Sequence, residues 1–166
     1  MTDAIPRSLV AEALLTDEAN VPPGDLPVDR LAERFLTYVR AGDGEEPAPA
    51  HHPDAWTYEV YCELTRVHPD LGLSATRAAL ATCVSPQEVA VVAAGPLEDL
   101  IAAHGAALID EIENLATRAP RFAYALTGVW PQDAGGTLIW ARVEAARRGV
   151  PGLDDGAPLP PPDGLV

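Results

Sequence analysis

Two carboxylates and a histidine that lie close together in the sequence are the residues best suited to chemistry. Glu98, Asp99 and His104 lie within seven residues, and Asp110 and Glu113 follow within the next nine. Carboxylates and an imidazole on adjacent helices could bind a divalent metal ion or act as a general acid and base. One hypothesis is therefore a metal-dependent enzyme or accessory protein that uses Glu98, Asp99, His104 and Asp110.

The same residues also have simple structural interpretations, and we favour these. Gly95-Pro96 predicts the start of a helix, so Glu98 would occupy its third position and cap backbone N–H groups. His104 would end that helix and bond leftover carbonyls or the neighbouring helix. Asp110 and Glu113 would lie on the solvated face of the next helix. The sequence thus predicts a non-enzymatic protein with no catalytic residue, no metal site and no cofactor.

The remaining histidines and cysteines form no recognisable catalytic or metal site. His52 and His68 each precede a proline at a predicted helix start, and neither matches the H-E-x-x-H spacing of zinc proteases. Cys62 and Cys83 lack C-x-x-C spacing and are interpreted as apolar packing residues. The chain has no Lys, which excludes the phosphate-binding loop, and it has no G-x-S-x-G nucleophile motif.

Proline and glycine divide the chain into segments typical of successive helices. In Ser85-Pro86-Gln87-Glu88, Ser85 can accept the Glu88 N–H while Glu88 reaches back to the Ser85 N–H. The apolar run Val89–Ala94 then predicts a buried helix, with a buried strand as the alternative. Other helices are expected at about 8–15, 28–40, 53–67, 69–82, 96–104, 106–118, 121–126 and 137–148.

These segments predict an all-α fold, a compact stack of short antiparallel helix pairs with about seven or eight helices. The expected organisation is an N-terminal helical segment (1–41), an acidic Pro/Gly linker (42–52), a helical core domain (53–149) and a disordered Pro-rich tail (150–166). Linker and tail carry too little periodic apolar surface to offset the entropy cost of ordering.

The charge balance narrows the classes of partner. The 166 residues include 25 acidic and 11 basic side chains, all of the latter Arg, for a net charge of −14. This charge argues against a nucleic-acid partner, which requires clustered cations.

The longest uncharged stretch, 122–132, is shorter than the roughly 20 residues of a membrane span. The first residues lack the basic and apolar regions of a secretion signal, so a cytoplasmic location is expected.

Three tryptophans stand out in a chain with 5% aromatic residues. Trp56 and Trp140 lie in helical apolar patterns, so we expect both in the core. Trp130 lies between Gly128 and Pro131, where its indole would either plug the core or anchor a partner. We favour the core for Trp130 as well.

One block of sequence resembles a bacterial family of uncharacterised domains, marked by an A-G-P-L-E-D-L-L segment, H-G and a closing G-V-W. The matching residues are Ala93–Ile101, His104-Gly105, Ile109–Glu113, Ala119–Phe122 and Ala125–Trp130. The similarity covers roughly Trp56 to Val143, and Ile101 stands where the family usually has Leu. The resemblance implies an α-helical fold and transfers no catalytic role.

Charge, size and motifs together predict an acidic protein-binding module. It would dock on a basic surface of another protein, gaining association rate from electrostatic steering. An immunity protein or an antitoxin-like neutraliser is one form of this hypothesis, and a structural subunit of a larger assembly is another alternative. The residues expected at the contact are Glu98, Asp99, His104, Asp110, Glu113 and Trp130.

Overall fold

Helices make up most of the protein, and many of their bounds follow the proline and glycine signals of the sequence. The computed structural model describes residues 3–42, 49 and 51–165. The α-helices are α1 (Arg7–Ala13), α2 (Val28–Arg40), α3 (Trp56–Val67), α4 (Pro69–Thr82), α5 (Pro86–Val92), α6 (Glu98–Arg118), α7 (Pro120–Leu126) and α8 (Leu138–Ala146). The predicted all-α fold is confirmed, with one addition: strands β1 (Ala4–Ile5) and β2 (Leu26–Pro27) pair antiparallel.

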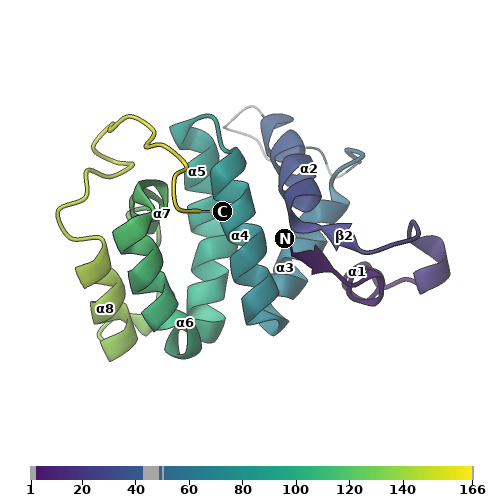
Figure 1. Cartoon of the computed structure of the whole chain (residues 1–166), viewed down its shortest axis with the longest axis horizontal. Helices are drawn as coiled ribbons and strands as arrows, with labels where there is room; N and C mark the ends of the chain where they lie inside the picture. The colour runs from purple at the N-terminus through teal and green to yellow at the C-terminus, as the bar shows by residue number, and fades with distance from the viewer. Residues whose placement is uncertain (1–2, 43–48, 50, 166) are drawn as a thin grey trace.

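The helices pack around a single core to which the N-terminal segment contributes. Figure 1 shows α4 to α6 in the middle, α7 and α8 on one side, and α2, α3 and the purple α1 on the other. Ile5, Leu31 and Phe35 are buried in the same cluster as Leu100 and Ile112 of α6. The N-terminal segment therefore packs on the helical core through residues such as Ile5, Leu31 and Phe35.

The helix around Gly95 continues where the sequence predicted a break. A π-helical turn, η2 (Ala93–Leu97), joins α5 directly to α6, so Gly95-Pro96 does not start a new helix. Pro96 lies inside this turn. Proline removes one N–H and its ring clashes with the carbonyl four residues earlier, and a wider π turn accommodates both effects. The strand alternative for Val89–Ala94 is wrong.

Gly105 does not end a helix either, because α6 runs through it to Arg118. A Cβ atom at Gly105 would lie 2.9 Å from Cγ2 of Ile139 in α8. Glycine is therefore needed here for the close approach of two helices, a use that local sequence signals do not reveal.

The continuous helical stretch from Pro86 to Arg118 is, within the described part of the chain, the one helix long and apolar enough by composition to cross a membrane. A core helix of a soluble protein passes the same test. In this fold Val92, Leu100 and Ile112 of the stretch are fully buried in the protein core. Part of the apolar surface of this stretch thus belongs to the protein core.

The Pro-rich tail differs from the expected disorder. Arg77 and Arg118 donate to the carbonyls of Leu165 (2.8 Å) and Gly164 (2.7 Å), and the Leu165 side chain is 1% exposed. The tail has five prolines, and its described residues form no regular secondary structure that would pair its carbonyls. Arginine side chains supply hydrogen-bond donors to these carbonyls instead. The expected acidic linker falls largely on residues 43–48 and 50, which lie outside the described residues.

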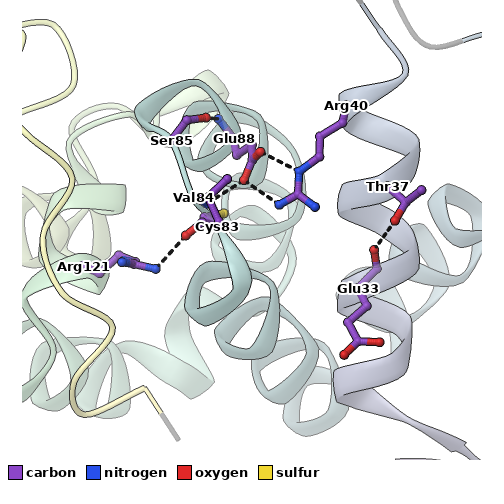
Figure 2. Close-up of polar contacts among 8 residues, drawn as sticks. All are labelled: Glu33, Thr37, Arg40, Cys83, Val84, Ser85, Glu88 and Arg121. Carbon is purple, nitrogen blue, oxygen red and sulfur yellow. Dashed lines mark hydrogen bonds and ion pairs between the residues drawn. The ribbon is translucent and has the colours of Figure 1, made fainter.

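Only half of the predicted capping box forms at the start of α5 (Figure 2). Ser85 Oγ accepts the Glu88 N–H at 3.2 Å, as predicted. The Glu88 carboxylate, however, accepts the N–H of Val84 at 2.7 Å and binds the Arg40 guanidinium of α2 at 2.8 and 3.1 Å. Burial by itself would raise the pKa of Glu88, but these bonds outweigh it and hold that pKa below its ordinary value.

Candidate functional site

Glu98, in the first turn of α6, fixes the loop that joins α7 to α8. Its carboxylate accepts the backbone N–H of Trp130 at 2.8 Å and the side-chain amide of Gln132 at 2.7 Å. The prediction that Glu98 caps a helix start is wrong, because the preceding π turn leaves no free helix end at this point. The carboxylate instead holds a loop more than 30 residues away in sequence.

The same loop is held at its base and is strained near its tip. Arg147 of α8 donates to the carbonyls of Leu126 (3.0 Å) and Val129 (2.9 Å). Gln132 adopts a φ of +46°, a conformation that residues with a side chain seldom take. Backbone strain of this kind persists only where surrounding contacts impose it. Arg147 and Glu98 therefore hold the first part of the loop, up to residue 132.

Trp130 projects from this fixed loop into solvent. Its side chain is 68% exposed, so the expectation that it packs in the core is wrong. Trp140 of α8, by contrast, is buried, and the Arg147 guanidinium lies 5.0 Å from its ring centroid. Trp140 therefore contributes to the core, whereas Trp130 lies on the surface.

Asp99 and His104 both contact the last turn of α3. Asp99 Oδ2 lies 3.7 Å from Nη2 of Arg66, and His104 Nε2 lies 2.9 Å from the Arg66 carbonyl oxygen. His104 sits inside α6 rather than at a helix end, but its ring does bond a carbonyl at the end of a neighbouring helix. Both residues join α6 to α3.

Asp110 and Glu113 share one arginine of α8. Arg142 donates to Asp110 at 2.6 Å and to both Glu113 oxygens at 2.8 and 2.6 Å. Hydrogen bonds from Arg142 lower the pKa of Glu113. Asp110 lies on the solvated face as expected, with a side chain that is 90% exposed, and Glu113 is 38% exposed. Through Arg142 the two carboxylates also link α6 to α8, which the sequence did not reveal.

The structure does not bring the hypothetical metal cluster together. Glu98 faces the α7–α8 loop, His104 faces α3, and Asp110 faces α8. Across the described residues no group of three or more His, Cys, Asp or Glu side chains is placed to hold a metal ion. The candidates instead make contacts within the fold to three different elements, the α7–α8 loop, α3 and α8.

The arginines are used almost entirely inside the protein. Nine of the 11 make a hydrogen bond or ion pair with another described residue: Arg7, Arg34, Arg40, Arg66, Arg77, Arg118, Arg121, Arg142 and Arg147. Several of these bonds go to backbone carbonyls, which leaves acidic side chains uncompensated. Arg30 and Arg148 make no such contact within the described part of the chain.

Sequence reasoning missed a cleft at the N-terminal end of the molecule. Its walls come from α1, the chain between α1 and β2, the first turns of α2, and the start of α3. Arg30, Arg34 and Trp56 line it. The four-residue spacing of the two arginines on a predicted helix was the available signal, because residues i and i+4 share a helix face.

A family of unknown function, DUF6869, matches residues 44–150. The chain belongs to this family, as the A-G-P-L-E-D-L segment indicated. No curated protein and no solved structure is detectably similar to the chain. The family's A-G-P-L-E-D-L segment corresponds here to the π turn and to Glu98, the residue that holds the Trp130 loop.

Proposed function

We propose that this protein is a non-enzymatic, acidic protein-binding module that docks through Trp130 on a basic surface of another protein. The observation that carries the proposal is the exposed indole of Trp130 on a loop clamped by Glu98 and Arg147. Trp is among the residues that contribute most binding energy at protein interfaces. A loop fixed before binding loses little conformational entropy when the partner arrives.

The charge distribution supports a basic partner. The protein has 14 more acidic than basic side chains, and nearly all its arginines are engaged within the fold. Asp133, which follows Trp130 in the same loop, is exposed. An excess of free carboxylates attracts a cationic surface and accelerates its association. Neutralisation of a basic partner, as by an immunity protein or antitoxin, is one form of this function.

Site-specific photo-crosslinking in cells of the native host tests the proposal. A photo-reactive amino acid is placed at Trp130 in one variant and at Val84, a 71% exposed control position on the chain between α4 and α5, in another. We expect a covalent adduct with a basic protein from position 130 only. No adduct at position 130, or the same adducts from both positions, would overturn the proposal. An adduct only with a second copy of this chain would favour the structural-subunit alternative.

A further inference from the structure

The cleft at the N-terminal end of the molecule has the dimensions of a small-molecule site. Its volume is about 700 Å³, and residues of α1, β2 and the beginnings of α2 and α3 line it. Figure 1 shows α1 and β2 at the end of the protein opposite α8. Ligand pockets in proteins span about 300–1,000 Å³. The cleft is thus large enough for a compact organic molecule.

Two arginines give the cleft a cationic wall. Arg30 and Arg34 are one helical turn apart on α2 and both line the cleft. Arg30 makes no hydrogen bond or ion pair with another described residue. Arg34 Nη1 lies 3.6 Å from Asp54 Oδ1, a loose ion pair that leaves other guanidinium N–H groups available. Planar guanidinium groups match the paired oxygens of a carboxylate or phosphate.

The rest of the cleft is largely apolar and includes an aromatic ring. Trp56, the first residue of α3, is half-buried against it, and Val10, Leu14 and Leu26 contribute aliphatic wall. An indole beside two guanidinium groups suits a ligand with a flat apolar body and an anionic end.

The outer wall of the cleft is fixed without a ligand. Arg7 donates through Nε and Nη2 to the Val21 carbonyl at 3.2 and 2.6 Å, and its backbone N–H bonds Asp25 Oδ1 at 3.1 Å. The turn between them contains two prolines and Gly24, whose φ of +92° a side chain would disfavour. A wall built in this way is ready for binding.

We propose that this cleft binds a small organic anion, with a carboxylate or phosphate group at Arg30 and Arg34 and a flat apolar body against Trp56. Charge complementarity favours this site, because the net charge of the protein as a whole, −14, repels anions. The two acids in the lining are already engaged, Asp25 with the Arg7 N–H and Asp54 with Arg34. The proposal is independent of the Trp130 surface. Most of the lining precedes residue 44, where the family match begins.

Titration with defined probes, followed by the indole N–H resonances of the three tryptophans, tests the proposal. The probes are 1-naphthoate, 1-naphthyl phosphate and the neutral 1-naphthalenemethanol, and the two anions distinguish the preferred head group. The native protein is compared with Arg30→Gln and with the matched control Arg148→Gln, which removes the other uncontacted arginine, just after α8. A Trp56→Phe variant assigns the Trp56 resonance.

We expect saturable shifts of the Trp56 resonance with at least one anion, and little movement of Trp140. Loss of a charged hydrogen bond weakens binding about tenfold, so Arg30→Gln is expected to raise Kd by about that factor, while Arg148→Gln leaves it unchanged. Three results would overturn the proposal: no saturable shift with either anion, equal binding of the neutral probe, or equal weakening by both variants. Failure to find a partner for Trp130 would not change any of these results.

Discussion

The partly buried ion pair between Arg40 of α2 and Glu88 of α5 gives the sharpest stability prediction. Glu88 has a side chain that is 9% exposed, and it accepts the Val84 N–H and binds Arg40, which is 42% exposed. A hydrogen bond to a charged group contributes about 1.5–3 kcal/mol. The ion pair with half-exposed Arg40 is screened by solvent and adds only about 0.2–1 kcal/mol. We therefore expect Glu88→Ala to lower the free energy of unfolding by about 3 kcal/mol.

The same pair also predicts how stability changes with pH. The folded-state pKa of Glu88 is below its ordinary value, so its contribution is fully present above about pH 4.5. That contribution is lost as the pH falls through the folded-state pKa. Glu88→Gln keeps an acceptor for Val84 but loses the charge, so it is expected to cost about 1 kcal/mol at pH 7. The difference in stability between Glu88→Gln and the native protein shrinks as the pH falls below the ordinary pKa of glutamate.

Urea unfolding followed by tryptophan fluorescence, at pH 7 and at successively lower pH, measures both effects. Glu33→Gln is the matched control, because Glu33 is exposed on α2 and points away from the pair in Figure 2. The reasoning is refuted if Glu88→Ala unfolds at the same urea concentration as the native protein. It is also refuted if Glu88→Gln and the native protein lose stability in parallel as the pH falls.

Three further predictions concern the buried arginine, the tail and the thiols. Arg121→Met removes bonds to the carbonyls of Leu80 and Cys83 at the end of α4 and to Pro160 in the tail, and should cost about 3 kcal/mol in urea unfolding; an unchanged midpoint would contradict this role. Leu165→Ala should cost about 2–5 kcal/mol, because Leu165 is fully buried, whereas a tail detached from the core predicts no change. Burial raises the pKa of Cys83 to about 12, so at pH 8 a thiol reagent should label half-buried Cys62 before Cys83. Peptide mass spectrometry measures the order of labelling, and labelling of Cys83 first would refute the packing.

Local signals in the sequence were sufficient for much of the helical framework. The expected helices at 28–40 and 69–82 have the observed bounds of α2 and α4. Pro69 and Pro86 begin helices because a missing N–H costs nothing in a first turn. Such signals depend on neighbours in the chain, and that is why they could be interpreted without the fold.

The errors arose where a distant residue decides the local structure. Gly105 has the form of a helix stop, but Ile139 of α8 packs against it and requires the absence of a side chain. Trp130 is a large aromatic residue of the kind expected in a core, but Glu98 binds its backbone N–H and its side chain is exposed. The tail has the composition of a disordered segment, but arginines of α4, α6 and α7 bind its carbonyls. None of these partners lies within 30 residues in the sequence.

The sequence identified residues of the candidate site but not what those residues do in the structure. Glu98 and Trp130 were both singled out from the sequence, and the structure joins them by a hydrogen bond of 2.8 Å. The roles were not predictable, because they depend on the π turn that keeps α5 and α6 continuous. The Arg30 and Arg34 cleft went unrecognised because its apolar walls come from three separate segments.

The most direct measurement is the affinity of the protein for the basic partner captured at position 130, determined by titration calorimetry for the native chain and for Trp130→Ala. Interface residues that dominate binding cost about 2 kcal/mol or more when truncated, so we expect Trp130→Ala to weaken binding roughly 30-fold. The native affinity should also fall as the salt concentration rises. Equal affinities for the native protein and Trp130→Ala would contradict the account.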